Sequence, residues 1–397
     1  MRIAVVHDTL NPCGGAERLA LYMIKALREL GYTVDLVTEE RTEWNRVRTL
    51  MSEDPRSYIS GELILPPWRK LPTIYGRYLE WFSRDIVGFT LRLRKRYDLI
   101  IVTKQLSVPV LGDIVYVHFP DFYPGTEVLY YPERYLYNTL LRVYSLPSQL
   151  LSKLLIRMFE SLEYRPLILT NSNFTRSLIQ RWLGVKAFIV HPPVNVEKYQ
   201  PLAENPERED LVVTIGRIER SKGQHVIPSI AKETPGVKYA IIGTVGQIDY
   251  LQCVKRLIKK LDVEERVRIY TNLSEDLKVK LLSKAKVYLH TMKYEHFGIA
   301  VVEAMAAGSI PVVHRYSGPW VDIVSRLEED IRYSYTDYSE CADIIMRTLS
   351  DWTPEKAKIL SAYAERFNYE NFKNLFLSII IKFMSSLSNN VKMYAKA

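Results

Sequence analysis

The N-terminal stretch MRIAVVHDTLNPCGGAERLALYMIKALRELGYTVDLVT, residues 1–38, decides the fold class. The apolar runs at residues 3–7 and 34–38 are short and rich in β-branched residues, which is typical of β-strands. Between them, apolar residues recur with helical spacing over residues 15–31. A strand, a helix and a second strand in this order form a βαβ unit, so the stretch predicts a parallel sheet in an α/β domain.

The same alternation continues through the first half of the chain. Near-continuous apolar runs, as expected of parallel strands that are covered on both faces, recur four more times. They lie at residues 98–103, 113–118, 167–172 and 188–193. We therefore expect residues 1–192 to form one Rossmann-like domain.

A break near residue 193 separates this domain from a second one. Pro192 and Pro193 cannot continue a central strand, and the polar stretch 203–210 follows before a new apolar run begins. Strands and helices then alternate again, which predicts a second doubly wound, Rossmann-like sheet over residues 193–376. Its strands are expected at 211–217, 239–243, 267–272, 287–291 and 310–314. We expect residues 377–397 to form a C-terminal helix that returns to the first domain.

Composition narrows the class of protein. Hydrophobic residues make up 47% and charged residues 25%, as in soluble globular domains. Three cysteines without a CxxC pair favour a reducing compartment, and no signal peptide or membrane-spanning run is visible, so we expect a cytoplasmic protein. The net charge of +9 predicts attraction to nucleic acid, anionic lipid or a phosphorylated metabolite.

The first candidate site is the turn between the first strand and the first helix. It contains Gly14 and Gly15, which let the backbone approach a ligand closely, and the start of the helix offers amide groups to an anion. A plain turn before a helix would use the same glycines, so a purely structural role is the alternative.

The second candidate site follows the strand at 211–217. Arg217 and Lys222 lie at and beyond its carboxyl end, where open α/β sheets bind ligands. Together they could bind one diphosphate. The alternative is a pair of solvated basic residues on a surface loop.

The third candidate site is the stretch EHFGIAVVE from Glu295 to Glu303. Glu295 falls in a loop, whereas Glu303 falls within an apolar helix and must be partly buried. A buried carboxylate needs hydrogen-bond donors, which sugar or ribose hydroxyls would supply. A structural salt bridge is the alternative for Glu303. His290 and His296 are six residues apart, across a strand end and a loop, and this spacing is only weak evidence for a metal site.

Taken together, the Gly-Gly turn, the Arg217 and Lys222 pair and the E-x7-E spacing resemble the retaining GT-B glycosyltransferases of family 4. Their order and placement match over nearly the whole chain. Within that family, further stretches resemble the α-1,2-mannosyltransferases of lipid-linked oligosaccharide assembly: YVHFP at 116–120, HTM at 290–292, EHFGI at 295–299, MAAG at 305–308, and SGP at 317–319 followed by DIV at 322–324. Tyr316-Ser317 in place of Ser-Gly, and Cys13 before the glycines, depart from the pattern and leave donor and acceptor open.

The resemblance implies a fold and an activity. The fold is GT-B, with two Rossmann-like domains facing a central cleft. The activity is transfer of a hexose, with mannose favoured, from a nucleotide-diphosphate sugar to an acceptor with retention of configuration. GDP-mannose is the favoured donor, and a lipid-linked saccharide is the expected acceptor.

The resemblance also implies roles for single residues, and these agree with the physical interpretation above. Arg217 and Lys222 would hold the donor diphosphate, Glu303 the ribose hydroxyls and Glu295 the transferred sugar. The acceptor side would include Glu17 and His118, with His118 near the reacting carbon. The other expected donor-binding residues are Gly14, Gly15, Phe297, Gly298 and Ile299.

The expected chemistry requires no metal ion and no cofactor. A diphosphate leaving group develops negative charge, so two fixed cations aimed at it would stabilise the transition state. In the front-face mechanism proposed for such retaining enzymes, the departing phosphate accepts the proton of the acceptor. The chain lacks an Asp-x-Asp pair, the usual anchor for a divalent ion in the other major glycosyltransferase fold.

Two other classes compete with this interpretation. Basic and aromatic residues interleave over 68–96, and an apolar, Tyr-rich segment follows over 122–164, as in proteins that bind an anionic membrane surface or stack on nucleic-acid bases. We favour an anionic membrane surface as the partner and expect no nucleic-acid partner. The enzyme is then expected to bind peripherally to the cytoplasmic face of a membrane. A non-catalytic binding protein, or a nucleotide-sugar epimerase of the same fold, are the alternatives.

Overall fold

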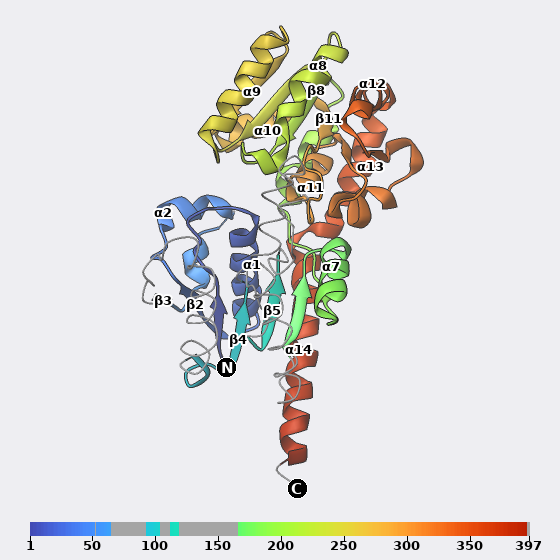
Figure 1. Cartoon of the computed structure of the whole chain (residues 1–397). Helices are drawn as coiled ribbons and strands as arrows, with labels where there is room; N and C mark the ends of the chain where they lie inside the picture. The colour runs from blue at the N-terminus through green and yellow to red at the C-terminus, as the bar shows by residue number, and fades with distance from the viewer. Residues whose placement is uncertain (52, 65–92, 104–111, 119–165, 395–397) are drawn as a thin grey trace. The chain divides into compact units, whose positions relative to one another are not determined.

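The structure is a computed structural model that describes all residues except 52, 65–92, 104–111, 119–165 and 395–397. The described residues divide into two compact units, each built around its own parallel sheet (Figure 1). Unit 1 contains the described residues up to Pro193 together with those from Tyr369 onward, and unit 2 is Val194–Asn368. The chain therefore re-enters unit 1 at Tyr369 rather than at residue 377.

The sheet of unit 1 has the order β3-β2-β1-β4-β5-β6-β7, and every neighbouring pair is parallel. The strands are rich in Val, Ile and Leu and mostly buried, as expected of a sheet covered on both faces. Sequence reasoning predicted all of them except the edge strand β3, although β7 is shorter than the predicted 188–193. The strands are β1 (Arg2–Val6), β2 (Thr33–Thr38), β3 (Gly61–Ile64), β4 (Leu99–Val102), β5 (Ile114–Val117), β6 (Leu167–Thr170) and β7 (Phe188–Ile189).

Helices α1 (Gly15–Glu29) and α14 (Tyr369–Tyr394) pack against each other in unit 1 (Figure 1). The apolar face of α1 and the α14 side chains Phe372, Phe376 and Ile380 share one hydrophobic core with the sheet. Burial of these rings and aliphatic chains is the main stabilising contribution of the contact. The other described helices of unit 1 are α2 (Trp44–Val47) and α7 (Asn173–Leu183).

The sheet of unit 2 has the order β10-β9-β8-β11-β12-β13 and is also parallel throughout. Its strands are β8 (Glu209–Ile215), β9 (Lys238–Gly243), β10 (Val267–Thr271), β11 (Ala285–Leu289), β12 (Ile310–His314) and β13 (Tyr333–Tyr335). The first five correspond to predicted strands, whereas the three-residue edge strand β13 was not predicted.

Helices cover both faces of this second sheet, and two hydrophobic cores lie between helices and strands. The tight packing of α11 on α13 is visible in Figure 1. The helices are α8 (Ile227–Glu233), α9 (Ile248–Lys260), α10 (Glu275–Leu282), α11 (Ile299–Ala306), α12 (Cys341–Asp351) and α13 (Pro354–Ala364).

The topology of each sheet fixes where a ligand can bind. In unit 1 the strand order reverses beside β1, which pairs with both β2 and β4, and in unit 2 it reverses beside β8, which pairs with both β9 and β11. Open α/β sheets bind ligands beyond the carboxyl ends of the strands at such a switch point. The loops after β1, β8 and β11 are therefore the expected location of functional residues.

Candidate active site

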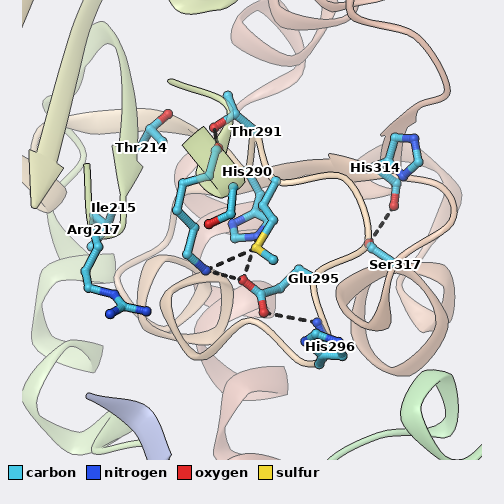
Figure 2. Close-up of polar contacts among 12 residues, drawn as sticks. Thr214, Ile215, Arg217, His290, Thr291, Glu295, His296, His314 and Ser317 are labelled. Atoms are coloured by element: carbon cyan, nitrogen blue, oxygen red, sulfur yellow. Dashed lines mark hydrogen bonds and ion pairs between the residues drawn. The ribbon is translucent and has the colours of Figure 1, made fainter. Parts of the chain in front are cut away.

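The centre of the candidate site in unit 2 is an ion pair between Lys222 and Glu295. Lys222 lies in a 3-10 turn after β8, and Glu295 lies in the loop between β11 and α11. Because β8 and β11 are adjacent, both side chains reach the same edge of the sheet. The Lys222 Nζ atom lies 2.9 Å from Glu295 Oε2 and 3.1 Å from the Met292 sulfur, as the dashed lines of Figure 2 mark.

Both oxygens of the Glu295 carboxylate have partners. Oε1 accepts a hydrogen bond from the His296 backbone N–H at 3.0 Å, and the His290 Nε2 atom lies 3.3 Å from Oε2 (Figure 2). Burial opposes ionisation of Glu295, but Lys222 and His290 outweigh it and hold the pKa of this carboxyl well below its usual range. Burial also lowers the pKa of His296 to about 4. At neutral pH the loop therefore presents an ionised carboxylate beside a neutral imidazole.

Arg217 lies on the same loop as Lys222 but points elsewhere. Its side chain is 63% exposed, and its guanidinium lies 3.6 Å from the Glu219 carboxylate. Figure 2 shows it to one side of Glu295. The structure thus brings Arg217 to the predicted edge of the sheet, with Lys222 turned to Glu295 and Arg217 open to solvent.

A narrow recess without room for a water molecule lies next to the ion pair. It is lined by Thr214, Ile215, Lys222, Gln224, His290, Thr291 and Met292. Most of these residues were not predicted as site residues, although all of them stand at or just beyond the ends of β8 and β11. Their position relative to the strand ends is the sequence feature that could have identified them.

The start of α11 provides the remaining predicted donor-binding residues of this loop. Gly298 has a φ of +85°, and a Cβ there would lie 2.7 Å from the Pro319 ring, so the position requires glycine. The first amides of the helix, including that of Ile299, have no acceptor within the helix and can face a ligand. Phe297 is 2% exposed and packs edge-on against Phe367, so its side chain belongs to the core and only its backbone is available to a ligand.

Glu303 is buried in α11, as the sequence predicted, and its side chain has a basic partner. Its Oε2 atom lies 3.4 Å from Lys278 Nζ. Lys278 also pairs with Glu275 at 2.8 Å and lies over the Tyr199 ring. Glu303 therefore forms the salt bridge that was the alternative to a binding role. If Glu303 also contacts a ribose, Lys278 already orients its carboxylate.

In unit 1, the Gly-Gly turn caps α1. Gly14 is the N-cap residue, and its backbone N–H donates to Glu17 Oε2 at 2.6 Å. Burial raises the pKa of Glu17, but its contacts with His7 and with backbone amides outweigh this and leave the pKa lowered. The Gly14 N–H is thus already hydrogen-bonded to Glu17 and is not available to a donor. The predicted donor-binding role of this turn then depends on the close approach of the backbone that its glycines allow.

Three polar side chains stand in a row at the carboxyl ends of β1, β4 and β5. They are His7, Thr103 and His118. The Nδ1 atom of His7 lies 2.8 Å from the Thr103 hydroxyl, and its Nε2 atom lies 3.5 Å from Glu17 Oε1. The rings of His7 and His118 meet edge-on with centroids 6.5 Å apart.

The predicted acceptor-side residues Glu17 and His118 therefore lie on either side of His7, which sequence reasoning missed. Asn171, at the end of β6, extends the row by donating to the His118 carbonyl at 2.8 Å. Like His118, both missed residues lie at the carboxyl end of a predicted strand, and this placement could have identified them.

Within the described residues, no three His, Cys, Asp or Glu side chains are grouped so that they could hold a metal ion. No helix among these residues is both long and apolar enough to cross a bilayer. The segment 122–164 lies outside the described residues, as does 68–92 of the basic and aromatic stretch.

Comparison with known proteins identifies the fold. The chain is similar in structure to the Anabaena protein HepE in complex with UDP, with a TM-score of 0.66 at 17% identity over 96% of this chain and 100% of that one. It is equally similar to a sucrose-phosphate synthase of Thermosynechococcus elongatus, with a TM-score of 0.67 at 16% identity over 97% and 100% of the two chains. The protein has the GT-B fold of glycosyltransferases, as the sequence predicted.

Family comparisons then place the chain. A model described as Glycosyltransferase Family 4 matches residues 13–198, and one described as Glycosyl transferases group 1 matches residues 195–367. The chain belongs to the glycosyltransferases that combine these two domains, which confirms the resemblance seen in the sequence.

Individual relatives are mannosyltransferases. The chain is 30% identical, over 69% of its length, to the GDP-Man:Man(3)GlcNAc(2)-PP-Dol alpha-1,2-mannosyltransferase of Dictyostelium discoideum, and 32% identical, over 54%, to that of Homo sapiens. It covers 60% and 48% of these two relatives. It is 24% identical to an alpha-1,3/1,6-mannosyltransferase of Candida glabrata over 94% of this chain and 87% of that one.

Proposed function

We propose that this glycosyltransferase transfers mannose from GDP-mannose to a lipid-linked saccharide with retention of configuration. The observation that carries the proposal is the partly buried Lys222–Glu295 pair at the switch point of the unit 2 sheet. It places a cation and a sugar-binding carboxylate together where α/β sheets bind nucleotides. The names of the relatives supply the donor, the sugar and the acceptor class.

In the proposed donor complex, unit 2 binds the nucleotide sugar. Lys222 and Arg217 contact the diphosphate, and the exposed Arg217 side chain is free to turn toward it. Glu295 accepts hydrogen bonds from hydroxyls of the mannose, because an ionised carboxylate only accepts. Glu303, oriented by Lys278, accepts from the ribose. The backbone of 297–299 contributes amides at the start of α11.

In the proposed reaction, the bond between mannose C1 and the diphosphate oxygen breaks while the acceptor oxygen bonds C1 on the same face. The proton of the acceptor hydroxyl passes to the departing phosphate oxygen. Lys222 and Arg217 stabilise the charge that develops on that phosphate, which is the main catalytic contribution expected of fixed cations. No metal ion takes part. The proposed acceptor-side residues are Glu17 and His118.

The proposed acceptor carries a lipid, so the enzyme would work at the cytoplasmic surface of a membrane. The basic and aromatic residues of 68–96 supply the contact, since aromatic rings suit the headgroup region and each basic residue near an anionic surface contributes about 1 kcal/mol. Among the described members of this stretch, Arg94 also pairs with Asp113 at 2.9 Å.

A donor panel tests this proposal. GDP-mannose should raise the melting temperature of the protein more than UDP-glucose or UDP-galactose, because a ligand that binds the folded state stabilises it. The stabilisation should be lost in Lys222→Ala and retained in Lys260→Ala, an exposed lysine on α9 that serves as the matched control. GDP should be released only when a lipid-linked saccharide is present. Equal stabilisation by all donors, or GDP release without acceptor, would contradict the proposal.

A further inference from the structure

The Lys222 ammonium has two competing partners in the proposed reaction. In the structure it pairs with Glu295 Oε2 at 2.9 Å, whereas the donor diphosphate would draw it away. The Glu295 side chain is only 15% exposed, and a largely buried carboxylate that loses its cation is destabilised unless another donor takes its place. The His296 amide and the mannose hydroxyls of the proposed complex donate to this carboxylate, and a protein group beside Oε2 would keep it oriented while the sugar reacts.

His290 lies where that protein group is needed. It follows β11 directly, its side chain is buried, and its Nε2 atom lies 3.3 Å from the oxygen that Lys222 contacts. Among the described residues this Nε2 atom has no hydrogen-bond partner, so its proximity to Glu295 is an ion-pair distance only. To hold the carboxylate, which only accepts hydrogen bonds, the ring would have to present Nε2–H. The same ring lines the recess beside the ion pair.

The orientation of the His290 ring is fixed from its other side. Its Nδ1 atom lies 3.3 Å from the Tyr288 hydroxyl. With the ring proton on Nε2, Nδ1 accepts from this hydroxyl, which then does not donate to the Ile215 carbonyl that also lies 3.3 Å away. The Tyr335 hydroxyl donates to the His290 backbone carbonyl at 2.8 Å. The backbone of His290 is thus held by Tyr335 and the Nδ1 side of its ring by Tyr288, which keeps Nε2 beside Glu295.

We propose that His290 is a positioning residue that takes over the Glu295 carboxylate when Lys222 turns to the donor diphosphate. This inference rests on the proposed function and adds a residue to it. With His290 in place, Glu295 stays ionised and oriented toward the sugar throughout the reaction.

The charged and titratable groups around His290 come from four segments. Lys222 lines the same recess from the turn after β8, and Glu295, which His296 follows, lies 3.3 Å away in the loop before α11. Tyr288 lies on its own strand, and Tyr335 of β13 donates to the His290 backbone carbonyl. Burial holds His296 neutral and raises the pKa of Tyr288 far above its usual range, so neither titrates near neutral pH. In the donor complex, protonation of Glu295 is therefore the event that His290 opposes.

The test compares variants that keep or remove the Nε2–H donor. The terminal amide of His290→Gln reaches the place of Nε2, whereas the shorter His290→Asn does not. His314→Gln, a buried histidine at the end of β12 that lies away from Glu295 in Figure 2, is the matched control. Transfer is measured across pH at saturating GDP-mannose, because this profile reports groups in the enzyme-donor complex.

We expect His290→Asn to shift the midpoint of the acidic limb to a pH about one unit higher, because Glu295 then protonates more readily as the pH falls. His290→Gln and His314→Gln should keep the wild-type profile. Tyr288→Phe, which removes only the hydroxyl beside Nδ1, should move the limb in the same direction as His290→Asn and serves if that variant does not fold.

The outcomes separate this inference from the proposed function. A wild-type enzyme that transfers mannose, with His290→Asn or Tyr288→Phe giving the unshifted profile of His314→Gln, would overturn the role of His290. A limb that moves equally in all four variants would show a general packing effect and overturn it as well. A wild-type enzyme that neither binds GDP-mannose nor transfers mannose would overturn the proposed function itself.

Discussion

Replacing Lys222 by methionine should separate the stability of the site from its activity. Methionine keeps most of the length of the side chain but leaves the Glu295 carboxylate without its closest cation. Breaking a fully buried ion pair costs about 3–5 kcal/mol. The two side chains here remain 23% and 15% exposed, so solvent compensates in part, and we expect a loss of roughly 2–3 kcal/mol.

The double variant Lys222→Met/Glu295→Gln should recover most of that loss, because the neutral amide no longer needs a cation. Thermal unfolding measures this as a melting temperature roughly 4–10 °C lower in Lys222→Met and nearly restored in the double variant. Transfer should be lost in both variants. A single variant as stable as wild type, or a double variant less stable than the single one, would refute the reasoning about this pair.

The remaining predictions concern other parts of the site. Arg217→Ala should lower kcat/KM about 100-fold at an unchanged melting temperature, because its exposed side chain contributes to catalysis and not to the core; unchanged steady-state kinetics would remove it from the site. Glu303→Gln should weaken GDP-mannose binding in calorimetry, and wild-type affinity would leave only its salt bridge with Lys278. Transfer should continue in EDTA, whereas a loss restored by magnesium or manganese would show a metal requirement. In sedimentation with anionic vesicles, wild type should pellet and charge reversal of Arg94, Lys95 and Arg96 should release it; wild type left in the supernatant would exclude this docking surface.

The fold was predictable because both sheets repeat a local pattern. Each apolar run that predicted a strand, from 3–7 to 310–314, corresponds to a strand in one of the sheets. The edge strands β3 and β13 were missed because they are short and partly exposed, so they lack a continuous apolar run. The start of α14 at Tyr369 was missed although Tyr369, Phe372, Phe376 and Ile380 already recur at helical spacing, because the stronger apolar run begins only at Leu375.

The candidate site was predictable only in part, since its contacts join residues that are distant in sequence. Sequence patterns placed Lys222 and Glu295 at strand ends, but only the pairing of β8 with β11 brings them together. Likewise, the partner of Glu303 is Lys278 from another helix. His7 was missed because a single histidine after a strand gains meaning only when Thr103 and Glu17 are seen beside it.

The most direct test of the central claim is the configuration of the product. GDP-mannose carries an α-linked mannose, so a retaining transfer to a short-chain lipid-linked saccharide should yield an α-mannoside together with one GDP for each mannose transferred. The anomeric linkage is read by NMR of the purified product. An α-linked product formed only in the presence of acceptor would support the account, and a β-linked product, or no product from GDP-mannose, would contradict it.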